Sequence, residues 1–262
     1  MTADHGVWVY AVTGAGLPED AGHDVAGVAR ETIRTVTAAG LTAVVGTVPL
    51  GEFGEEALRS NLENLDWLET VARAHDGVVS AVVRRAPAIP LRLATVYRDD
   101  DRVRDVLDAR RADFEEALAL VTGRTEWGVK AYADLDAIAA SAVEAAGSGA
   151  EKGTGTAYLL RRRAQLSARD EAERVATGDA DALHSLLLRC AAAGRRQAPT
   201  DPTISGRRDR MVLNGTYLVD DDRRDEFAEA VAAARTRFDG LHLELTGPWP
   251  PYSFAGADRG NP

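Results

Sequence analysis

The chain has 262 residues, of which 45% are hydrophobic and 27% charged, and its formal net charge at pH 7 is −10. This balance is typical of a folded globular protein, and the length favours two domains of ordinary size. The negative charge disfavours nucleic acid as a main partner, because a phosphate backbone would be repelled. Apolar runs are too short to span a membrane, and Cys190 is the single cysteine, so we expect a reducing, cytoplasmic setting without disulfides.

The beginning of the chain predicts two strands separated by a loop and a helix. Residues 7–12, Val-Trp-Val-Tyr-Ala-Val, are apolar on both sides, as expected of a strand that is covered on both faces. A loop at 13–24 and a weak helix at 26–38 follow. Residues 41–50 are predicted as a second strand, which Pro49 ends.

Two helices and a third strand complete the first half. Gly77 is placed to end a helix at 61–76, which carries apolar side chains on one side at helical spacing, namely Leu62, Leu65, Leu68, Val71 and Ala72. Residues 89–97 alternate between apolar and polar side chains, which predicts a strand, with 78–83 as its hairpin partner. Residues 100–122 have the most regular amphipathic pattern in this half and predict one helix.

The second half opens with a strand at 126–133, where apolar side chains alternate. The glycine-rich segment 145–155 is predicted to be a flexible loop. Residues 156–193 indicate a long helix or a helical pair that breaks at Gly178.

A strand at 211–219, a helix at 222–238 and a strand at 241–246 close the second half. The whole pattern predicts an α+β protein of two domains, each a small, mainly antiparallel sheet with crossing helices, as variants of the ferredoxin-like arrangement. We expect an N-terminal domain at 1–125 and a C-terminal domain at 126–262.

The sequence offers no candidate catalytic, cofactor-binding or metal-binding residue. The glycine-rich turn at 12–18 follows a strand, but Glu19 stands where a dinucleotide-binding turn needs its third glycine, and Pro18 removes an amide donor. The histidines lack the spacing of a zinc site. Acidic side chains lie at expected loops and helix starts, where capping explains them.

The C-terminal segment 243–254 combines prolines with aromatic residues. Its glycine and first proline end the last strand, and the following prolines hold an extended run from which the aromatic rings can pack on an apolar surface. We interpret this segment as a clasp that seals a core, with direct partner contact as the alternative. Its characteristic residues are Gly247, Pro248, Trp249, Pro250, Tyr252 and Phe254.

Five segments, in order along the chain, resemble the GvpF/GvpL family of gas vesicle proteins. The most specific is Leu-Glu-Leu-Thr-Gly-Pro-Trp-Pro-Pro-Tyr-Ser-Phe at 243–254. The others are 7–12, Ile-Pro-Leu-Arg-Leu-Ala-Thr-Val-Tyr at 89–97, Glu-Trp-Gly-Val-Lys-Ala-Tyr at 126–132 and Gly-Thr-Ala-Tyr-Leu-Leu-Arg-Arg at 155–162. One departure is Leu93-Ala94, where the family would have an aromatic residue followed by glycine.

The resemblance implies a non-enzymatic accessory or minor structural protein, without a required cofactor, that serves gas vesicle organization and hence buoyancy in the cytoplasm. Its implied partners are the small hydrophobic shell protein GvpA and other accessory Gvp proteins. The resemblance leaves open whether the chain is of the GvpF or the GvpL type. An alternative is a small-molecule enzyme or a metabolite-sensing module on paired ferredoxin-like domains, because one fold carries many functions.

The first domain is expected to carry more of the GvpA recognition than the second. Its first strand is apolar on both sides, and a small sheet that leaves one face uncovered would offer a hydrophobic docking surface. The candidate partner-binding residues are Trp8, Tyr10 and Arg92. Coverage of both faces by the helices at 26–38 and 61–76 is the alternative.

Overall fold

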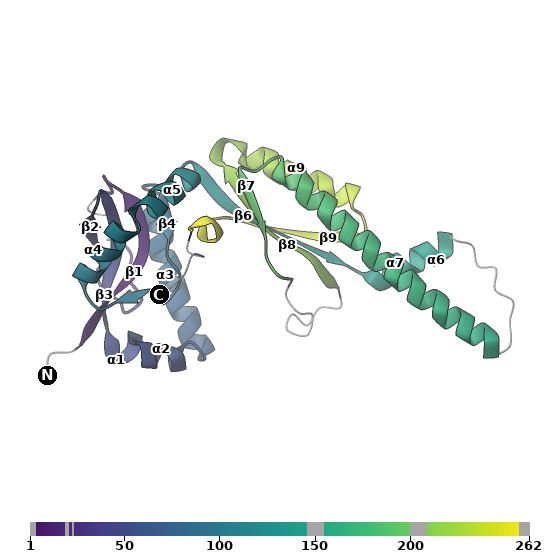
Figure 1. The fold of residues 1–262 in the computed structure, drawn as a ribbon, viewed down its shortest axis with the longest axis horizontal. Coiled ribbons are helices and arrows are strands. Elements are labelled where there is room, and N and C mark those ends of the chain that lie inside the picture. The colour runs from purple at the N-terminus through teal and green to yellow at the C-terminus, as the bar shows by residue number, and fades with distance from the viewer. Residues whose placement is uncertain (1–3, 19–20, 23, 146–154, 200–208, 257–262) are drawn as a thin grey trace. The chain divides into compact units, whose positions relative to one another are not determined.

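The computed structural model describes residues 4–18, 21–22, 24–145, 155–199 and 209–256 (Figure 1). The chain forms two compact units, one of Met1–Thr125 with Trp249–Pro262 and one of Glu126–Pro248. Each unit has an antiparallel sheet with helices, so the predicted α+β class is confirmed. The segment that begins at Trp249 is grouped with the first unit, whereas the sequence prediction placed it in the second. Residues 146–154 of the predicted flexible loop lie outside the described residues.

The sheet of the first unit has the strand order β2-β3-β1-β4, and β5 also pairs with β1. Its central strand β1 pairs antiparallel with β3, β4 and β5. The bounds are β1 His5–Gly14, β2 Arg34–Ala38, β3 Leu41–Pro49, β4 Ala88–Pro90 and β5 Val96–Tyr97. The predicted strands at 7–12 and 41–50 are confirmed.

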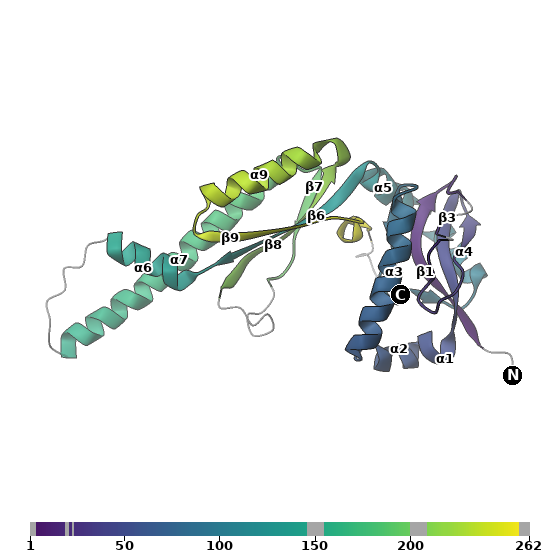
Figure 2. The same cartoon turned by 180° about the vertical axis from the view of Figure 1, so that it is seen from behind.

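Helices cover both faces of this sheet, as the two opposite views show (Figures 1 and 2). One core lies between the sheet and α3, and the other lies between the sheet and the pair α4 and α5. Two short helices, α1 and α2, lead from β3 into α3. The bounds are α1 Leu50–Phe53, α2 Glu55–Asn61, α3 Leu65–Val83, α4 Asp100–Ala109 and α5 Arg111–Val121.

The second unit has a four-stranded sheet in the order β7-β8-β6-β9 and a single main core. The helices α7 and α9 bury their apolar faces in this core. The bounds are β6 Arg124–Ala133, α6 Leu135–Ala145, α7 Gly155–Leu188, β7 Ala193–Arg196, β8 Arg210–Asp220, the 3-10 turn η1 Asp221–Arg223, α9 Arg224–Arg237 and β9 Leu241–Trp249. A further 3-10 turn, η2 (Tyr252–Phe254), follows in the first unit.

The predicted helix at 26–38 is wrong, because the end of this segment is strand β2. Ala39 and Gly40 both have positive φ values, 54° and 78°, and form a two-residue connection to β3. Such turns match the twist of a hairpin, and the following strand then pairs with β2 residue by residue. The Ala-Gly pair before the apolar run at 41 was the sequence signal for this turn.

The helix predicted at 61–76 begins later and ends later than expected. Asn64 caps α3, since its side-chain oxygen accepts the N–H groups of Asp66 and Trp67 at 3.1 and 3.3 Å. The helix continues past Gly77 to Val83, so the predicted hairpin strand at 78–83 is wrong. Burial of Val78, Val79 and Val82 on the sheet outweighs the cost of one glycine, which is about 1 kcal/mol.

Two other predicted elements are each divided in two. The strand at 89–97 is interrupted between β4 and β5, where Ala94 adopts a positive φ of 65°. This is the position at which the family resemblance calls for glycine, the residue that adopts such a conformation most readily. The helix at 100–122 breaks at Arg110, which separates α4 from α5.

The long helix α7 passes through Gly178 without a break, contrary to prediction. Its buried face is made by alanines and, further along, by leucines at helical spacing, and Gly178 lies on the exposed side. Leu166 and Val175 are 59% and 43% exposed. Between residues 166 and 188, where the structure describes the side chains of this helix, the buried residues are Ala172, Ala176, Ala180, Leu183 and Leu187.

Candidate functional site

Two of the three predicted partner-binding residues are in the core of the first unit. Trp8 and Tyr10 each have 0% exposure. They project from β1 into the core beneath α3, so the face that was expected to be open is covered. The helix that covers it is α3, while residues 26–33 and β2 contribute no helix. These two side chains therefore cannot contact a partner directly without unfolding of the unit.

Trp8 is joined to a buried histidine that the sequence analysis did not single out. Its indole Nε1–H donates to Nδ1 of His75 at 3.0 Å, and Nε2 of His75 lies 3.1 Å from the carbonyl oxygen of Leu91. Because Nδ1 accepts, the ring proton is on Nε2, which donates to that carbonyl. Burial lowers the pKa of His75 to about 4, so the ring is neutral at pH 7.

Tyr10 is joined to Glu31 and to the segment that precedes β2. Its hydroxyl donates to the Glu31 carboxylate and accepts the N–H of Val28 at 2.9 Å. The second carboxylate oxygen accepts the N–H of Ala29 at 2.8 Å. Burial, together with the Glu31 carboxylate, raises the pKa of the Tyr10 hydroxyl above its ordinary value. This network fixes the loop across the sheet and leaves the hydroxyl protonated at neutral pH.

Two glycines make room for the Glu31 carboxylate. A Cβ added at Gly27 or at Gly46 would lie 2.0 Å from Glu31 Oε1. Because that approach is far inside van der Waals contact, any side chain at either position would displace the carboxylate. Two hydrogen-bonded pairs, Trp8 with His75 and Tyr10 with the partly buried Glu31, thus meet where the Tyr10 and His75 rings are 5.3 Å apart and together stabilise the first unit.

Arg92, the third predicted residue, is exposed on the segment between β4 and β5. Its neighbour Leu91 donates its N–H to the carbonyl of Tyr10 at 2.9 Å and accepts from His75. The structure therefore brings all three predicted residues to one region of the sheet, but only Arg92 reaches the surface there.

Some aromatic residues of the C-terminal segment are buried, and others are exposed. Phe254 is 2% exposed, whereas Trp249 is 51% exposed. The Tyr252 ring lies 6.5 Å from the His75 ring, and its hydroxyl donates to Asp76 at 3.3 Å. Gly247 and Pro248 are still part of β9. The clasp interpretation therefore fits Phe254 and the buried Pro250, but not Trp249.

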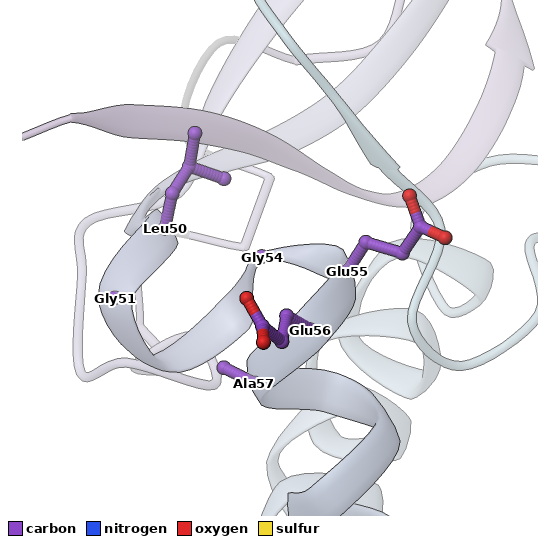
Figure 3. Close-up of a pocket in the computed structure, with 6 residues that line it drawn as sticks. All are labelled: Leu50, Gly51, Gly54, Glu55, Glu56 and Ala57. Atoms are coloured by element: carbon purple, nitrogen blue, oxygen red, sulfur yellow. The ribbon is translucent and has the colours of Figure 1, made fainter.

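A shallow pocket of about 470 Å³ lies where α1 meets α2 (Figure 3). Leu50 and Ala57 supply apolar surface, and the carboxylate of Glu56 lies beside the turn that joins the two helices, while that of Glu55 extends away from it. Gly51 and Gly54 complete the lining. A little further along the chain, Leu62 and Leu65 are 38% and 77% exposed.

The second unit contains a partly buried polar pair. His184 Nδ1 lies 2.7 Å from the Tyr217 hydroxyl, and burial raises the pKa of that hydroxyl. A Cβ at Gly215 would lie 2.7 Å from the same hydroxyl oxygen, so the glycine is required by close packing. Across the described ranges, no group of three or more metal-binding side chains occurs, and none of the helices there is long and apolar enough to span a membrane.

These features define a protein of two α+β units in which hydrogen-bonded polar side chains lie within or beside the apolar cores. Comparison with known proteins then places it. The model of the family "Gas vesicle synthesis protein GvpL/GvpF" matches residues 6–256, and the chain belongs to this family. Family membership supports a role in gas vesicle formation.

Relatives and solved structures agree with this assignment. The chain is 44% identical to gas vesicle protein L of Streptomyces sp. (strain CB03234), over 98% of this chain and 95% of the relative. It is 27% identical to gas vesicle protein F of the same strain, over 86% and 88% of the two chains. The crystal structure of GvpF from Anabaena sp. PCC7120 superposes with a TM-score of 0.67 at 17% identity, covering 96% of both chains. The structure of GvpF from Microcystis aeruginosa gives the same TM-score at 18% identity, over 95% and 98% of the two chains. These structures show that the fold is shared.

Proposed function

We propose that the protein is a non-enzymatic accessory factor of gas vesicle assembly, which binds the small hydrophobic shell protein GvpA and other accessory Gvp proteins. The observation that carries this proposal is the family match over residues 6–256, which includes both units. We place its action at the vesicle as the shell grows.

The physical need for such a protein follows from the nature of a hydrophobic shell subunit. Exposed apolar surfaces associate without selectivity, so a subunit awaiting assembly requires a folded partner that covers this surface or delivers it to the growing edge. A partner of this kind acts through its own surface and needs no reactive group.

We further propose that the first unit contributes more of the GvpA recognition than the second. Trp8 and Tyr10 would act indirectly, because they hold the sheet, the loop at 24–33 and α3 in place. The contact surface itself must then be formed by exposed residues of this unit, among them Arg92 and the side chains at the beginning of α3.

The test is capture of the full chain and of residues 126–248 by immobilised, purified GvpA, after circular dichroism has confirmed that each is folded. We expect the full chain to be retained and the second unit alone to be retained much more weakly. Failure of the full chain to bind would contradict the proposed function. Equal retention of both would contradict the assignment of recognition to the first unit.

A further inference from the structure

We propose that the corner formed by α1, α2 and the beginning of α3, residues 50–70, binds a helix of a partner protein that carries arginine or lysine beside leucine-like residues. We call this surface the acidic corner. The inference deepens the proposed function, on which it rests, by stating the chemistry of the partner segment.

The apolar part of the acidic corner lies at the turn between α2 and α3. Leu65 is 77% exposed and Leu62 is 38% exposed, although the sequence pattern predicted both on the buried side of a helix. The buried face of α3 starts only at Val71, so the sheet does not cover these leucines. Leucines that project from a turn are suited to insert between the side chains of a partner helix.

The acidic corner is also strongly negative. Residues 50–70 contain six carboxylates and one arginine, Arg59. That arginine pairs with Glu55 at 2.8 Å. By contrast, Glu56, Glu63 and Asp66 have no ion-pair partner within the part of the chain that the structure describes. Unpaired carboxylates around exposed leucines attract a partner that is basic as well as apolar and repel an acidic one.

The pocket between α1 and α2 favours a basic side chain of the partner. Leu50 and Ala57 line this pocket together with Glu56, whose carboxylate lies on the Ala57 side of the turn (Figure 3). A lysine or arginine side chain fits such a place, since its methylene groups can lie on apolar atoms while its charged end reaches a carboxylate.

Hydrogen bonds between the helices keep the acidic corner in one arrangement. The side-chain amide of Asn61 donates to the carbonyl oxygen of Glu52 at 3.0 Å, and the Trp67 indole N–H donates to the Glu52 carboxylate, also at 3.0 Å. These bonds connect α1 with α2 and with α3. A surface that is fixed before binding loses less conformational entropy when the partner docks.

The experiment measures binding of the full chain to a synthetic amphipathic helix of leucine and arginine, and to the same helix with glutamate in place of arginine. Two variants alter the acidic corner, the double variant Glu56→Gln/Glu63→Gln and the single variant Leu65→Ser. The matched controls are Asp105→Asn/Asp108→Asn on α4, across the sheet, and Leu166→Ser on α7. Asp105, Asp108 and Leu166 are exposed, so all variants are expected to fold.

We expect the arginine helix to bind and the glutamate helix not to bind. Each variant of the acidic corner should weaken binding about five- to tenfold, while each control stays within about twofold of the unaltered chain. At about 0.5 M salt the effect of the double variant should shrink, because screening removes the charge contribution. Equal binding of the two helices, or variants that match their controls, would overturn the proposal.

The same variants are then assayed for capture by GvpA. Capture that is weakened only by the variants of the acidic corner supports both proposals. Capture that none of the variants affects would overturn the assignment to this corner and leave the proposed function intact. Absence of GvpA capture, with selective binding of the arginine helix, would contradict the GvpA proposal and support the corner as a docking site for a basic helix.

Discussion

At the scale of single residues, His75 couples the stability of the first unit to pH. Its ring is buried and neutral, with both nitrogens hydrogen-bonded, and burial lowers its pKa to about 4 from an ordinary value of 6.5. Between these two pH values the unfolded chain binds a proton at this site and the folded chain does not. The contribution of His75 is therefore fully present above about pH 6.5 and is lost as the pH falls toward 4.

We predict that this loss amounts to about 3 kcal/mol of unfolding free energy between pH 7 and pH 4. The measurement is urea-induced unfolding, followed by tryptophan fluorescence at several pH values. His75→Gln supplies the comparison, because a glutamine amide can accept from Trp8 and donate to Leu91 but does not titrate. Its stability should be lower at pH 7 and should depend less on pH. The assignment would be refuted by parallel pH profiles for the two proteins.

Gly46 provides a second prediction at this scale. A methyl group there would lie 2.0 Å from Glu31 Oε1, so Gly46→Ala must displace the carboxylate that binds Tyr10 and Ala29. We expect a loss of about 2–3 kcal/mol, because buried polar groups are left without partners. Thermal unfolding of the variant measures this loss.

The matched control is Gly77→Ala in α3. A Cβ at Gly77 meets no atom within 4 Å, and alanine is the better helix former. This variant should be more stable than the unaltered chain by about 0.5–1 kcal/mol. A comparable destabilisation at both glycines would argue against a specific role for the Glu31 contact.

At the scale of elements, the C-terminal segment contains one buried aromatic ring and one half-exposed aromatic ring. Phe254 is 2% exposed and Trp249 is 51% exposed. We predict that Phe254→Ala lowers the unfolding free energy by about 3–4 kcal/mol and Trp249→Ala by about 1–2 kcal/mol, because only buried area contributes in full. Calorimetry on the two variants measures which substitution causes the larger loss of stability. The opposite order would show that Trp249 is the main anchor of the segment.

The elements that the sequence predicted well are those whose pattern agrees with their tertiary surroundings. Both β1 and β6 have side chains suited to a strand and lie within sheets, so pattern and fold coincide. The failures arose where packing overruled local propensity. Gly77 and Gly178 lie inside helices because each helix has a buried face on its other side, and a glycine signal alone does not reveal that face.

The candidate site was predicted in its position but not in its chemistry. The sequence pointed to Trp8, Tyr10 and Arg92, which lie in one region of the first unit. Trp8 is buried beneath α3 through its contact with His75, which lies 67 residues further along the chain. Local periodicity carries no information about such a contact. The acidic corner did have a local signal, the density of carboxylates around Leu62 and Leu65, but the helical interpretation of 61–76 assigned both leucines to the core.

At the scale of the whole molecule, the chain leaves the first unit at Thr125 and returns to it at Trp249. The first unit is therefore discontinuous in sequence, and its C-terminal piece closes a loop that contains the entire second unit. Ala255 is buried in the core between the sheet and α4 and α5, and Gly256 lies near Ala117 of α5. The last described residues thus belong to the packing of a domain that began some 250 residues earlier.

This organisation predicts that removal of residues 249–262 destabilises the first unit selectively. The truncated chain loses the buried side chains of Phe254 and Ala255, and we expect a cost of about 3–5 kcal/mol to the unit that contains β1 and β3. Hydrogen exchange read by mass spectrometry distinguishes the units, since amides of β1 and β3 should exchange faster while those of β8 and α9 keep their protection. The full-length variant Phe254→Ala should reproduce most of the effect, because it removes the largest buried side chain of the segment. Faster exchange in β8 and α9 to the same extent would mean that the segment stabilises the second unit instead, and the discontinuous first unit would have to be abandoned.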